Sequence, residues 1–242
     1  MDIIQFFSSV THHLKNTLYP PRCLICDAAG KGDRDLCEPC AQSLPWIKKA
    51  CSQCALPLPD DSGENLLCGR CIQKRPYFDT ALCVFSFEKA IIGLIHQLKF
   101  HDKLSISRLF GNLLAEKAVA MLDKPDCLLP VPLYKKRLKQ RGFNQSVEVS
   151  HALKKAWDVP IETRLVRRIR ETQSQTGLNM QARRRNMKGA FEVCAKIDHE
   201  HVVIIDDVVT TGSTVNELAR LLKRNGVKKV SVCGIARAPI KH

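Results

Sequence analysis

The chain has 242 residues, of which 45% are hydrophobic and 26% are charged, a composition typical of folded globular domains and not of disordered chains. It contains no run of about 18 apolar residues, which excludes a transmembrane helix and stable membrane insertion. The first residues include Asp2 and lack the basic start of a secretory signal peptide. We therefore expect a cytoplasmic protein, whose length suits either one ordinary domain with a small module or two compact domains.

The first part of the chain is dominated by cysteines. After an expected N-terminal helix over residues 1–20, eight of the 12 cysteines form four C-x-x-C pairs within residues 21–78. Two residues between thiolates let a tight turn direct both sulfurs at one tetrahedral metal ion. Four pairs therefore predict two structural zinc ions with four cysteine ligands each. The ligands are Cys23, Cys26, Cys37, Cys40, Cys51, Cys54, Cys68 and Cys71.

Other uses of these cysteines fit the pattern less well. Disulfides would need an oxidising compartment. A redox C-x-x-C is expected once, at the start of a helix, and not four times in a turn-rich stretch. The zinc pairing stays open, because sequential and cross-braced arrangements both satisfy the ligand count. The remaining Cys83, Cys127, Cys194 and Cys233 lie in or beside apolar runs, and we expect them in the core.

Residues 79–242 have the pattern of an α/β domain. Short apolar runs predict strands, and longer segments with apolar residues at helical spacing predict helices. The expected strands are 80–87, 127–133, 161–166, 202–205 and 229–235, and the expected helices are 89–100, 105–122, 144–156 and 213–225. Strands that alternate with helices predict a mainly parallel sheet covered by helices.

Positive charge is concentrated in residues 131–190, which hold 15 Lys and Arg residues against four Asp and Glu. Segregated charge predicts a polyanionic partner, either a nucleic acid or a diphosphate ligand. A solvated basic face is the simpler alternative. Within this segment, residues 167–190 are polar and show no period, and so long a connection in a compact domain is either functional or disordered.

Residues 201–214 carry the clearest chemical signal. An apolar run is followed by two carboxylates, Asp206 and Asp207, at the place where open parallel sheets contact their ligands. Adjacent carboxylates suit the cis-diol of a ribose. The hydroxyl-rich turn that follows opens a helix, and a helix N-terminus suits a phosphate dianion. The turn consists of Thr210, Thr211, Gly212, Ser213 and Thr214.

Alternative interpretations of this stretch are weaker. Neither a Walker loop nor a dinucleotide-binding glycine motif occurs in it. Helix capping alone would account for Ser213, because such residues often cap helices for stability. It would not account for two acids at the end of an apolar strand. We therefore expect a pocket for a phosphorylated ribose.

The motif IIDDVVTTGST, residues 204–214, resembles the phosphoribosyl-diphosphate motif of type I phosphoribosyltransferases. LPVPL at 129–133, RGFNQ at 141–145, TQSQ at 172–175 and RRNMKGAF at 184–191 resemble the ComF/GntX family, as does a cysteine-rich N-terminus with a double zinc ribbon. The resemblance covers nearly the whole chain. It implies a double zinc ribbon at 21–78 and a phosphoribosyltransferase-like domain at 79–242.

The resemblance also implies roles for individual residues. Asp206 and Asp207 would hold the ribose diol, and would be the catalytic pair in an active enzyme, while the 210–214 turn would hold the 5′-phosphate. Pro130, Val131 and Pro132 match the diphosphate loop, and Arg137 or Arg141 would neutralise the diphosphate. Mg²⁺ would enter mostly with phosphoribosyl diphosphate.

Two functions from different classes follow from the resemblance. Proteins related to ComF handle incoming single-stranded DNA in natural transformation, beside a helicase-like DNA-uptake partner. The basic segment suits such a strand, and the expected contacts are Lys135, Lys136, Arg141, Arg183, Arg184 and Arg185. In that case the pocket would bind DNA termini or a regulatory nucleotide. The alternative is an active phosphoribosyltransferase with an unknown acceptor, and a purely structural pocket is a third possibility.

Overall fold

The computed structural model describes residues 20–61, 63, 66–100, 104–171 and 187–239. The chain divides into two compact units, Met1–Leu44 and Pro45–His242. The division falls between the second and third cysteine pairs, so the second half of the cysteine segment lies in the same unit as the α/β elements. The predicted helix over residues 1–20 lies outside the described residues, apart from Pro20. No helix in the described ranges is long and apolar enough to cross a membrane.

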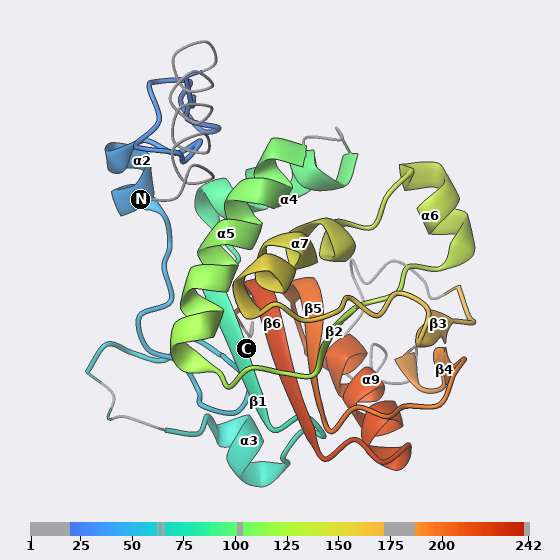
Figure 1. The fold of residues 1–242 in the computed structure, drawn as a ribbon. Helices are drawn as coiled ribbons and strands as arrows, with labels where there is room; N and C mark the ends of the chain where they lie inside the picture. Colours follow the sequence, from blue (N-terminus) through green and yellow to red (C-terminus); the bar gives the residue numbers. More distant parts are fainter. Residues whose placement is uncertain (1–19, 62, 64–65, 101–103, 172–186, 240–242) are drawn as a thin grey trace, which may run out of the picture. The chain divides into compact units, whose positions relative to one another are not determined.

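A four-stranded parallel sheet forms the centre of the second unit (Figure 1). Its order is β1-β6-β5-β2, and every neighbouring pair is parallel. The strands are β1 (Thr80–Ser86), β2 (Cys127–Pro130), β5 (His201–Val209) and β6 (Lys229–Arg237). The central residues of β5 are fully buried because other elements cover both faces of the sheet. The predicted parallel α/β fold is confirmed.

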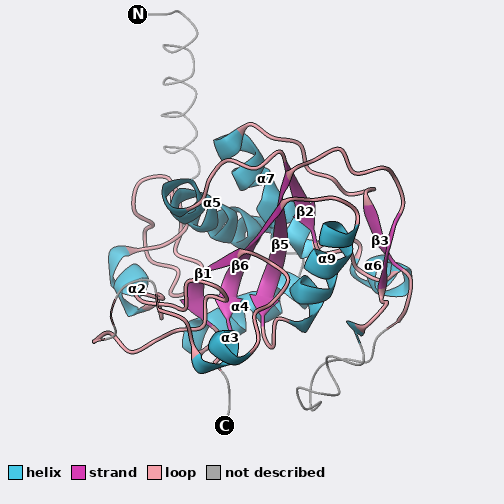
Figure 2. Cartoon of the chain, turned by 90° about the horizontal axis from the view of Figure 1, so that it is seen from below, coloured by secondary structure: helices cyan, strands magenta, loops and turns pink. Residues whose placement is uncertain are grey.

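Helices cover both faces of the sheet (Figures 1 and 2). On one face lie α5 (Leu104–Met121) and α7 (Gln145–Trp157), which pack closely on each other. On the other face, α9 (Ser213–Arg224) buries Val215, Leu218 and Leu222 in one apolar cluster with Val202 and Ile204 of β5. The remaining helices of this unit among the described residues are α3 (Gly69–Gln73), α4 (Lys89–Phe100) and α6 (Lys135–Arg141).

The α9 face of the sheet is also covered by the residues around the third cysteine pair. Ile47, Ala55 and Phe78 belong to the same buried cluster as Val215 and Val202. The backbone N–H of Ile47 donates to the Val84 carbonyl of β1 at 2.9 Å. This cysteine-bearing segment is therefore part of the core of the α/β domain.

The structure differs from the prediction in four local features. The strand expected over 161–166 is wrong: Ile161 forms only an isolated bridge with Leu128. The strand in this region is β3 (Val166–Arg168), which pairs with β4 (Phe191–Val193) in a two-stranded antiparallel sheet. Strand β5 continues past the predicted end and includes both aspartates. Helix α6 was not predicted, because its sequence lacks apolar residues at helical spacing. Cys194 is exposed, whereas Cys83, Cys127 and Cys233 are buried as expected.

Two helical glycines offer a test of this packing. A Cβ at Gly111 in α5 would meet the Val149 carbonyl at 3.0 Å and the Ala152 Cβ at 3.1 Å in α7, whereas a Cβ at Gly93 in α4 meets nothing within 4 Å. Alanine is favoured over glycine in a helix by about 1 kcal/mol. We expect Gly93→Ala to raise the thermal midpoint and Gly111→Ala to lower it, because overpacking costs about 1–3 kcal/mol. Equal shifts of both midpoints in scanning calorimetry would contradict the close contact of α5 and α7.

Candidate functional site

The two aspartates lie inside strand β5, near its carboxyl end. Asp206 aligns with Gly234 of the neighbouring strand β6. Asp207 is buried, with 6% of its surface exposed, and Asp206 is half-buried. Strand register places the backbone of both residues just past the end of β2, where the Val131 backbone N–H donates to the Ile205 carbonyl at 2.9 Å.

Asp207 is held by three groups from separate parts of the chain. The Lys99 ammonium of α4 lies 2.6 Å from Oδ2 of Asp207. The Gln145 side chain, in the first turn of α7, donates from Nε2 to the same oxygen at 3.1 Å. The backbone N–H of Val208 donates to Oδ1 at 2.7 Å. Arg141, the last residue of α6, donates to Gln145 Oε1 at 2.6 Å, so a polar network connects α6, α7, β5 and α4.

The two carboxyl groups have opposite electrostatic environments. Burial, together with the neighbouring charge of Asp207, raises the pKa of Asp206 well above its ordinary value. Burial also acts to raise the pKa of Asp207, but the charge and hydrogen bond of Lys99 hold that pKa below its ordinary value. Asp207 is therefore a compensated carboxylate. Asp206 is the group that gains most from added hydrogen-bond donors or positive charge.

The 210–214 turn joins β5 to the N-terminus of α9. Gly212 precedes the first helical residue with φ of 76°, a left-handed conformation that glycine adopts at little cost. The hydroxyls of Thr211 and Ser213 are hydrogen-bonded at 2.8 Å, and the Ser213 N–H donates to Thr211 Oγ1 at 3.3 Å. Backbone N–H groups at the start of a 12-residue helix form an environment suited to a phosphate.

The segment after β2 is fixed to the start of α7. The side chain of Asn144 donates from Nδ2 to the Val131 carbonyl at 3.0 Å. Its Oδ1 accepts from the Ser146 N–H at 3.0 Å and so caps α7. Pro130 and Val131 are buried and Pro132 is half-buried. The residues predicted as a diphosphate loop therefore lie beside the aspartates and are held in place by a helix cap.

Three arginines bring positive charge toward this site. Burial lowers the pKa of Arg141, while the Asp207 charge acts to raise it and the Arg137 charge to lower it. Burial and the Arg137 charge lower the pKa of Arg168 in β3, while the charge of Asp206 acts in the opposite direction. Arg168 also lies over the Phe191 ring, 5.7 Å from its centroid. Arg141 and Arg168 therefore each feel the charge of one of the two aspartates.

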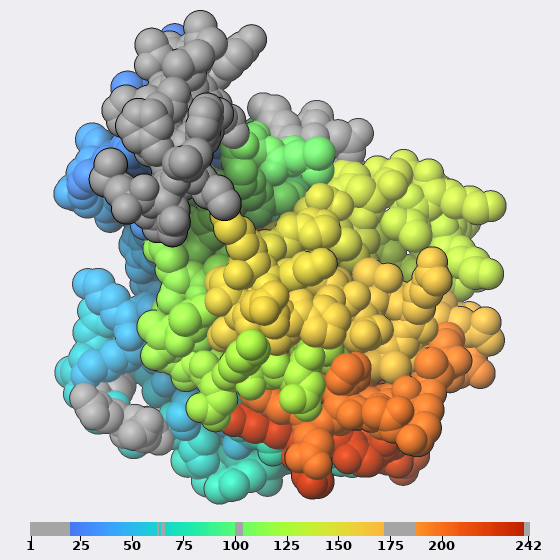
Figure 3. Space-filling view, in the orientation of Figure 1, coloured from blue at the N-terminus to red at the C-terminus, as the bar shows by residue number. Residues whose placement is uncertain are grey.

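Only some of the basic residues predicted to contact nucleic acid lie within the described part of the chain. Lys135 and Lys136 are exposed on α6, and the Lys136 ammonium lies 3.5 Å from Glu171. The side chains of α6, α7 and the two-stranded β3–β4 sheet are neighbours on the face shown in Figure 3. Arg183, Arg184 and Arg185 lie outside the described residues.

Sequence reasoning missed Lys99, Gln145 and Arg168. Gln145 stands in the RGFNQ motif, where only Arg141 was given a role, and Arg168 was one of many arginines in a basic segment. Lys99 carried no signal, because it is a lysine in the last turn of an amphipathic helix, where lysine is common. Only the contact with Asp207 distinguishes it.

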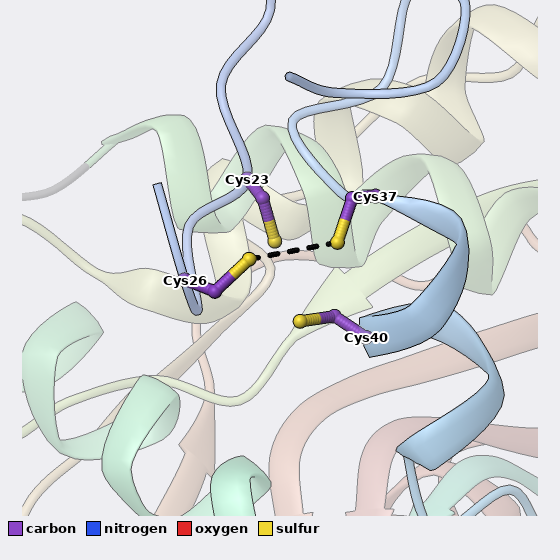
Figure 4. A group of neighbouring side chains, drawn as sticks. All are labelled: Cys23, Cys26, Cys37 and Cys40. Atoms are coloured by element: carbon purple, nitrogen blue, oxygen red, sulfur yellow. Dashed lines mark hydrogen bonds between the residues drawn. The ribbon is translucent and has the colours of Figure 1, made fainter. Parts of the chain in front are cut away.

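The eight cysteines gather into two four-sulfur groups that pair sequentially along the chain. The first cysteine cluster is Cys23, Cys26, Cys37 and Cys40 (Figure 4), and the second is Cys51, Cys54, Cys68 and Cys71. Within each cluster the ligand atoms lie within 4.8 Å of one another. The sulfurs of Cys26 and Cys37 are 3.6 Å apart, and so are those of Cys54 and Cys68. A zinc–sulfur bond of about 2.3 Å in a tetrahedron requires about 3.8 Å between sulfurs, so both clusters fit zinc.

The two clusters repeat one backbone design. The N–H of Cys23 donates to the Ala28 carbonyl and that of Cys51 to the Leu56 carbonyl, both at 2.8 Å. The residue after each first pair is left-handed, with φ of 62° at Asp27 and 55° at Ala55. The second pair in each cluster begins a short helix, α2 (Glu38–Ser43) in the first unit and α3 in the second.

Thiolates are favoured at the first cysteine of each cluster. Burial acts to raise the thiol pKa values, but backbone N–H groups lower that of Cys23 to about 6 and that of Cys51 to about 7. The Cys68 N–H donates to Cys51 Sγ at 3.3 Å. Because the thiolate is the metal ligand, this arrangement prepares both clusters for a divalent cation.

Comparison with known families agrees with both halves of the chain. Residues 14–83 match the double zinc ribbon domain, and residues 138–242 match the phosphoribosyl transferase domain. The protein is thus a double zinc ribbon protein with a phosphoribosyltransferase domain.

Several known proteins are similar to this chain over nearly its full length. The chain is 36% identical over 224 residues to the DNA utilization protein YhgH of Escherichia coli (strain K12), a match that covers 90% of this chain and 97% of that protein. It is 30% identical over 244 residues to Competence protein F of Haemophilus influenzae, covering 98% and 100% of the two chains. The Competence protein ComFC of Bacillus subtilis is 25% identical over 225 residues, covering 84% and 89%. The chain belongs to the ComF/GntX family.

The Lys99–Asp207 pair can be tested with a double-mutant cycle. Removal of one partner of a buried ion pair costs about 3–5 kcal/mol, because the other charge is left without compensation. We expect Lys99→Met to lower the free energy of unfolding by about 3 kcal/mol in the wild type and by less than about 1 kcal/mol in an Asp207→Asn background. Urea titration at constant zinc measures both values. Lys89→Met, an exposed lysine in the same helix, serves as the control, and equal costs in both backgrounds would exclude the coupling.

Proposed function

We propose that the carboxyl end of β5 binds a phosphorylated ribose. The observation that carries this proposal is the order of groups along the chain: two adjacent carboxyl groups, then within a few residues a glycine-containing turn at the N-terminus of α9. Asp206 and Asp207 accept hydrogen bonds from the ribose hydroxyls, and the 210–214 turn binds the 5′-phosphate. The segment 130–132 and the Arg137 and Arg141 side chains bind further phosphates.

We infer that this pocket serves the handling of incoming single-stranded DNA in natural transformation, in the cytoplasm. Relatives named as competence and DNA utilization proteins support this inference. The basic side chains of α6, together with the predicted contacts Arg183, Arg184 and Arg185, provide charge for a phosphate backbone. The ligand of the pocket is then a DNA terminus or a nucleotide, and the protein partner is a helicase-like DNA-uptake protein.

A second candidate function is phosphoribosyl transfer, which the match to the phosphoribosyl transferase domain favours. Phosphoribosyl diphosphate would enter with Mg²⁺ bound mostly to its own oxygens. The protein's residues would hold the diol, the 5′-phosphate and the diphosphate, while an acceptor nitrogen displaces diphosphate from C1. Catalysis of this kind depends on positioning and charge stabilisation more than on a protein nucleophile.

The two cysteine clusters are proposed to hold one structural zinc ion each. All four sulfurs of a cluster would be ligands, which leaves no open position for water or substrate. Zinc would stabilise segments that have little apolar core of their own. Two zinc ions per chain are the expected stoichiometry in elemental analysis.

The ribose-phosphate pocket predicts a specific loss of ligand affinity. We expect Asp206→Asn to weaken binding of phosphoribosyl diphosphate at least tenfold, because the amide keeps only one of the two acceptor oxygens and presents an NH₂ donor in place of the other. The raised pKa of Asp206 makes the neutral substitute compatible with folding. Isothermal titration calorimetry measures the affinity. Asp123→Asn, which removes an exposed carboxylate that pairs with Lys229 outside the site, is the matched control. Unchanged affinity in Asp206→Asn would refute the assignment.

Single-stranded DNA binding predicts a steep dependence on salt. Each phosphate contact that is lost reduces the slope of log K against log salt by about 0.7 for single strands. We expect Lys135→Glu with Lys136→Glu to reduce both affinity and slope. Lys154→Glu with Lys155→Glu is the control, because these exposed lysines lie in the last turn of α7, about 14–15 Å along the helix axis from Gln145. Fluorescence anisotropy at several salt concentrations measures the slopes. Equal losses of DNA affinity in the two double variants would indicate general electrostatic attraction of DNA without a defined binding site.

A cellular assay separates the two functions. Transformation frequency is compared for the wild type, for Asp206→Ala with Asp207→Ala, and for Cys51→Ser with Cys54→Ser. DNA handling through the pocket predicts a loss in the double aspartate variant. If the wild type releases diphosphate in the presence of an acceptor and the double aspartate variant does not, the transferase function is supported instead. If the double aspartate variant transforms as well as the wild type, only a structural role remains for the pocket.

A further inference from the structure

Arg237 is the largest fully buried side chain of the described residues, with 2% of its surface exposed. It is the last residue of β6. Its Nε donates to the Cys54 carbonyl at 2.9 Å, and its Nη1 donates to the Val209 carbonyl at 2.8 Å. The same nitrogen donates to the carbonyls of Ala238 and Thr210. Its acceptors within the described ranges are thus backbone carbonyls from three segments.

These acceptors join two sites that are far apart in the sequence. Val209 and Thr210 end β5 and begin the 210–214 turn, whereas Cys54 is a member of the second cysteine cluster, 183 residues before Arg237. A buried cation must keep its hydrogen bonds, since an unsatisfied charge in the interior costs several kcal/mol. A displacement of the Cys54 carbonyl therefore shifts the guanidinium, and with it the backbone at the start of the turn.

The second cysteine cluster has further contacts with the domain. Gln53 donates from Nε2 to the Phe78 carbonyl at 2.7 Å, and the Thr80 hydroxyl donates to the Ser52 carbonyl at 3.0 Å. A few residues after the cluster, the Tyr77 N–H donates to Asn216 Oδ1 at 2.7 Å, in the first turn of α9. The turn is thus held on both sides, by Arg237 at its start and by Tyr77 through the helix that follows it.

The first cysteine cluster provides a contrast. The turn that follows its first cysteine pair has the same backbone hydrogen bond and the same left-handed residue as the corresponding turn of the second cluster. It belongs to the Met1–Leu44 unit, however, and the second cluster belongs to the unit that holds the 210–214 turn. Two cysteine clusters with the same local structure therefore lie in different compact units.

We propose that the second cysteine cluster, when it holds its metal ion, positions the ribose-phosphate turn through Arg237. Arg237 is a positioning residue, and the pocket requires metal at the second cluster but not at the first. Loss of that metal releases the Cys54 carbonyl, loosens the turn and weakens phosphate binding with every pocket residue still present. The effect on ligand affinity rests on the proposed function of the pocket, whereas the mechanical coupling does not.

The first test measures local dynamics without any ligand. A Cys23→Ser, Cys26→Ser variant is expected to carry one zinc ion, at the second cluster. Chelation of this ion should accelerate hydrogen exchange of amides 211–216 at least tenfold, while amides of the core strand β2 keep their protection. Uniform exchange across the domain after chelation, or unchanged exchange at 211–216, would overturn the proposal.

The second test uses Arg237 itself. Arg237→Met should keep two zinc ions per chain, show the same acceleration at 211–216, and bind phosphoribosyl diphosphate at least tenfold more weakly than the wild type. Arg237→Lys should recover part of the affinity, because the positive charge and one donor nitrogen remain. If Arg237→Met keeps full affinity and protection, the proposal is wrong, and if it does not fold, the chelation test decides. A wild type that does not bind phosphoribosyl diphosphate would refute the proposed function and leave the exchange result to judge the coupling.

Discussion

Compensation of the buried charge on Asp207 is the constraint on which the candidate site depends. A carboxylate near the end of a fully covered strand is stable only if other parts of the chain supply positive charge and hydrogen-bond donors. Lys99 supplies the charge, and Gln145 supplies a donor at the start of α7. The positions of α4, α6 and α7 around the end of β5 are therefore linked to one another through a single side chain. The same compensation does not extend to the neighbouring Asp206, whose pKa stays raised by burial and by the charge of Asp207.

The cysteine segment has two structural roles, although its clusters share one local design. The family match treats residues 14–83 as one double zinc ribbon. In the structure, the division into compact units separates the clusters, and the second contributes Ala55 and neighbouring apolar residues to the core of the α/β domain. The second cluster has only a small apolar group of its own, in which Leu56, Leu58 and Leu67 pack against its cysteines. The sheet face beside α9 adds a larger core next to it. The domain boundary predicted near residue 78 marks the end of the cysteine-rich composition. The boundary after Leu44 in the structure marks where packing contacts along the chain become few.

Much of the fold could be predicted because the relevant signals are local. Apolar runs indicated β1, β2, β5 and β6, and helical periods indicated α4, α5, α7 and α9, each within a few residues of its observed bounds. Prediction failed where the signal was short or ambiguous. The residues around Ile161 are apolar enough for a strand but form only one bridge, and α6 is too polar to show a period. Strand β5 extends past its apolar run because β6 continues to pair with it through Asp206 and beyond.

The sequence by itself determined the parallel α/β class, the four C-x-x-C pairs, and the order of the two carboxylates and the hydroxyl-rich 210–214 turn, because each depends on residue type and spacing along the chain. Tertiary structure alone decided that the clusters pair sequentially, that Lys99 and Gln145 hold Asp207, and that Arg237 connects Cys54 with the turn. Gln145 and Asp207 are 62 residues apart, and Arg237 and Cys54 are 183 apart. Contacts over such separations follow from the register of the sheet and the packing of helices on its two faces, and no local pattern encodes them.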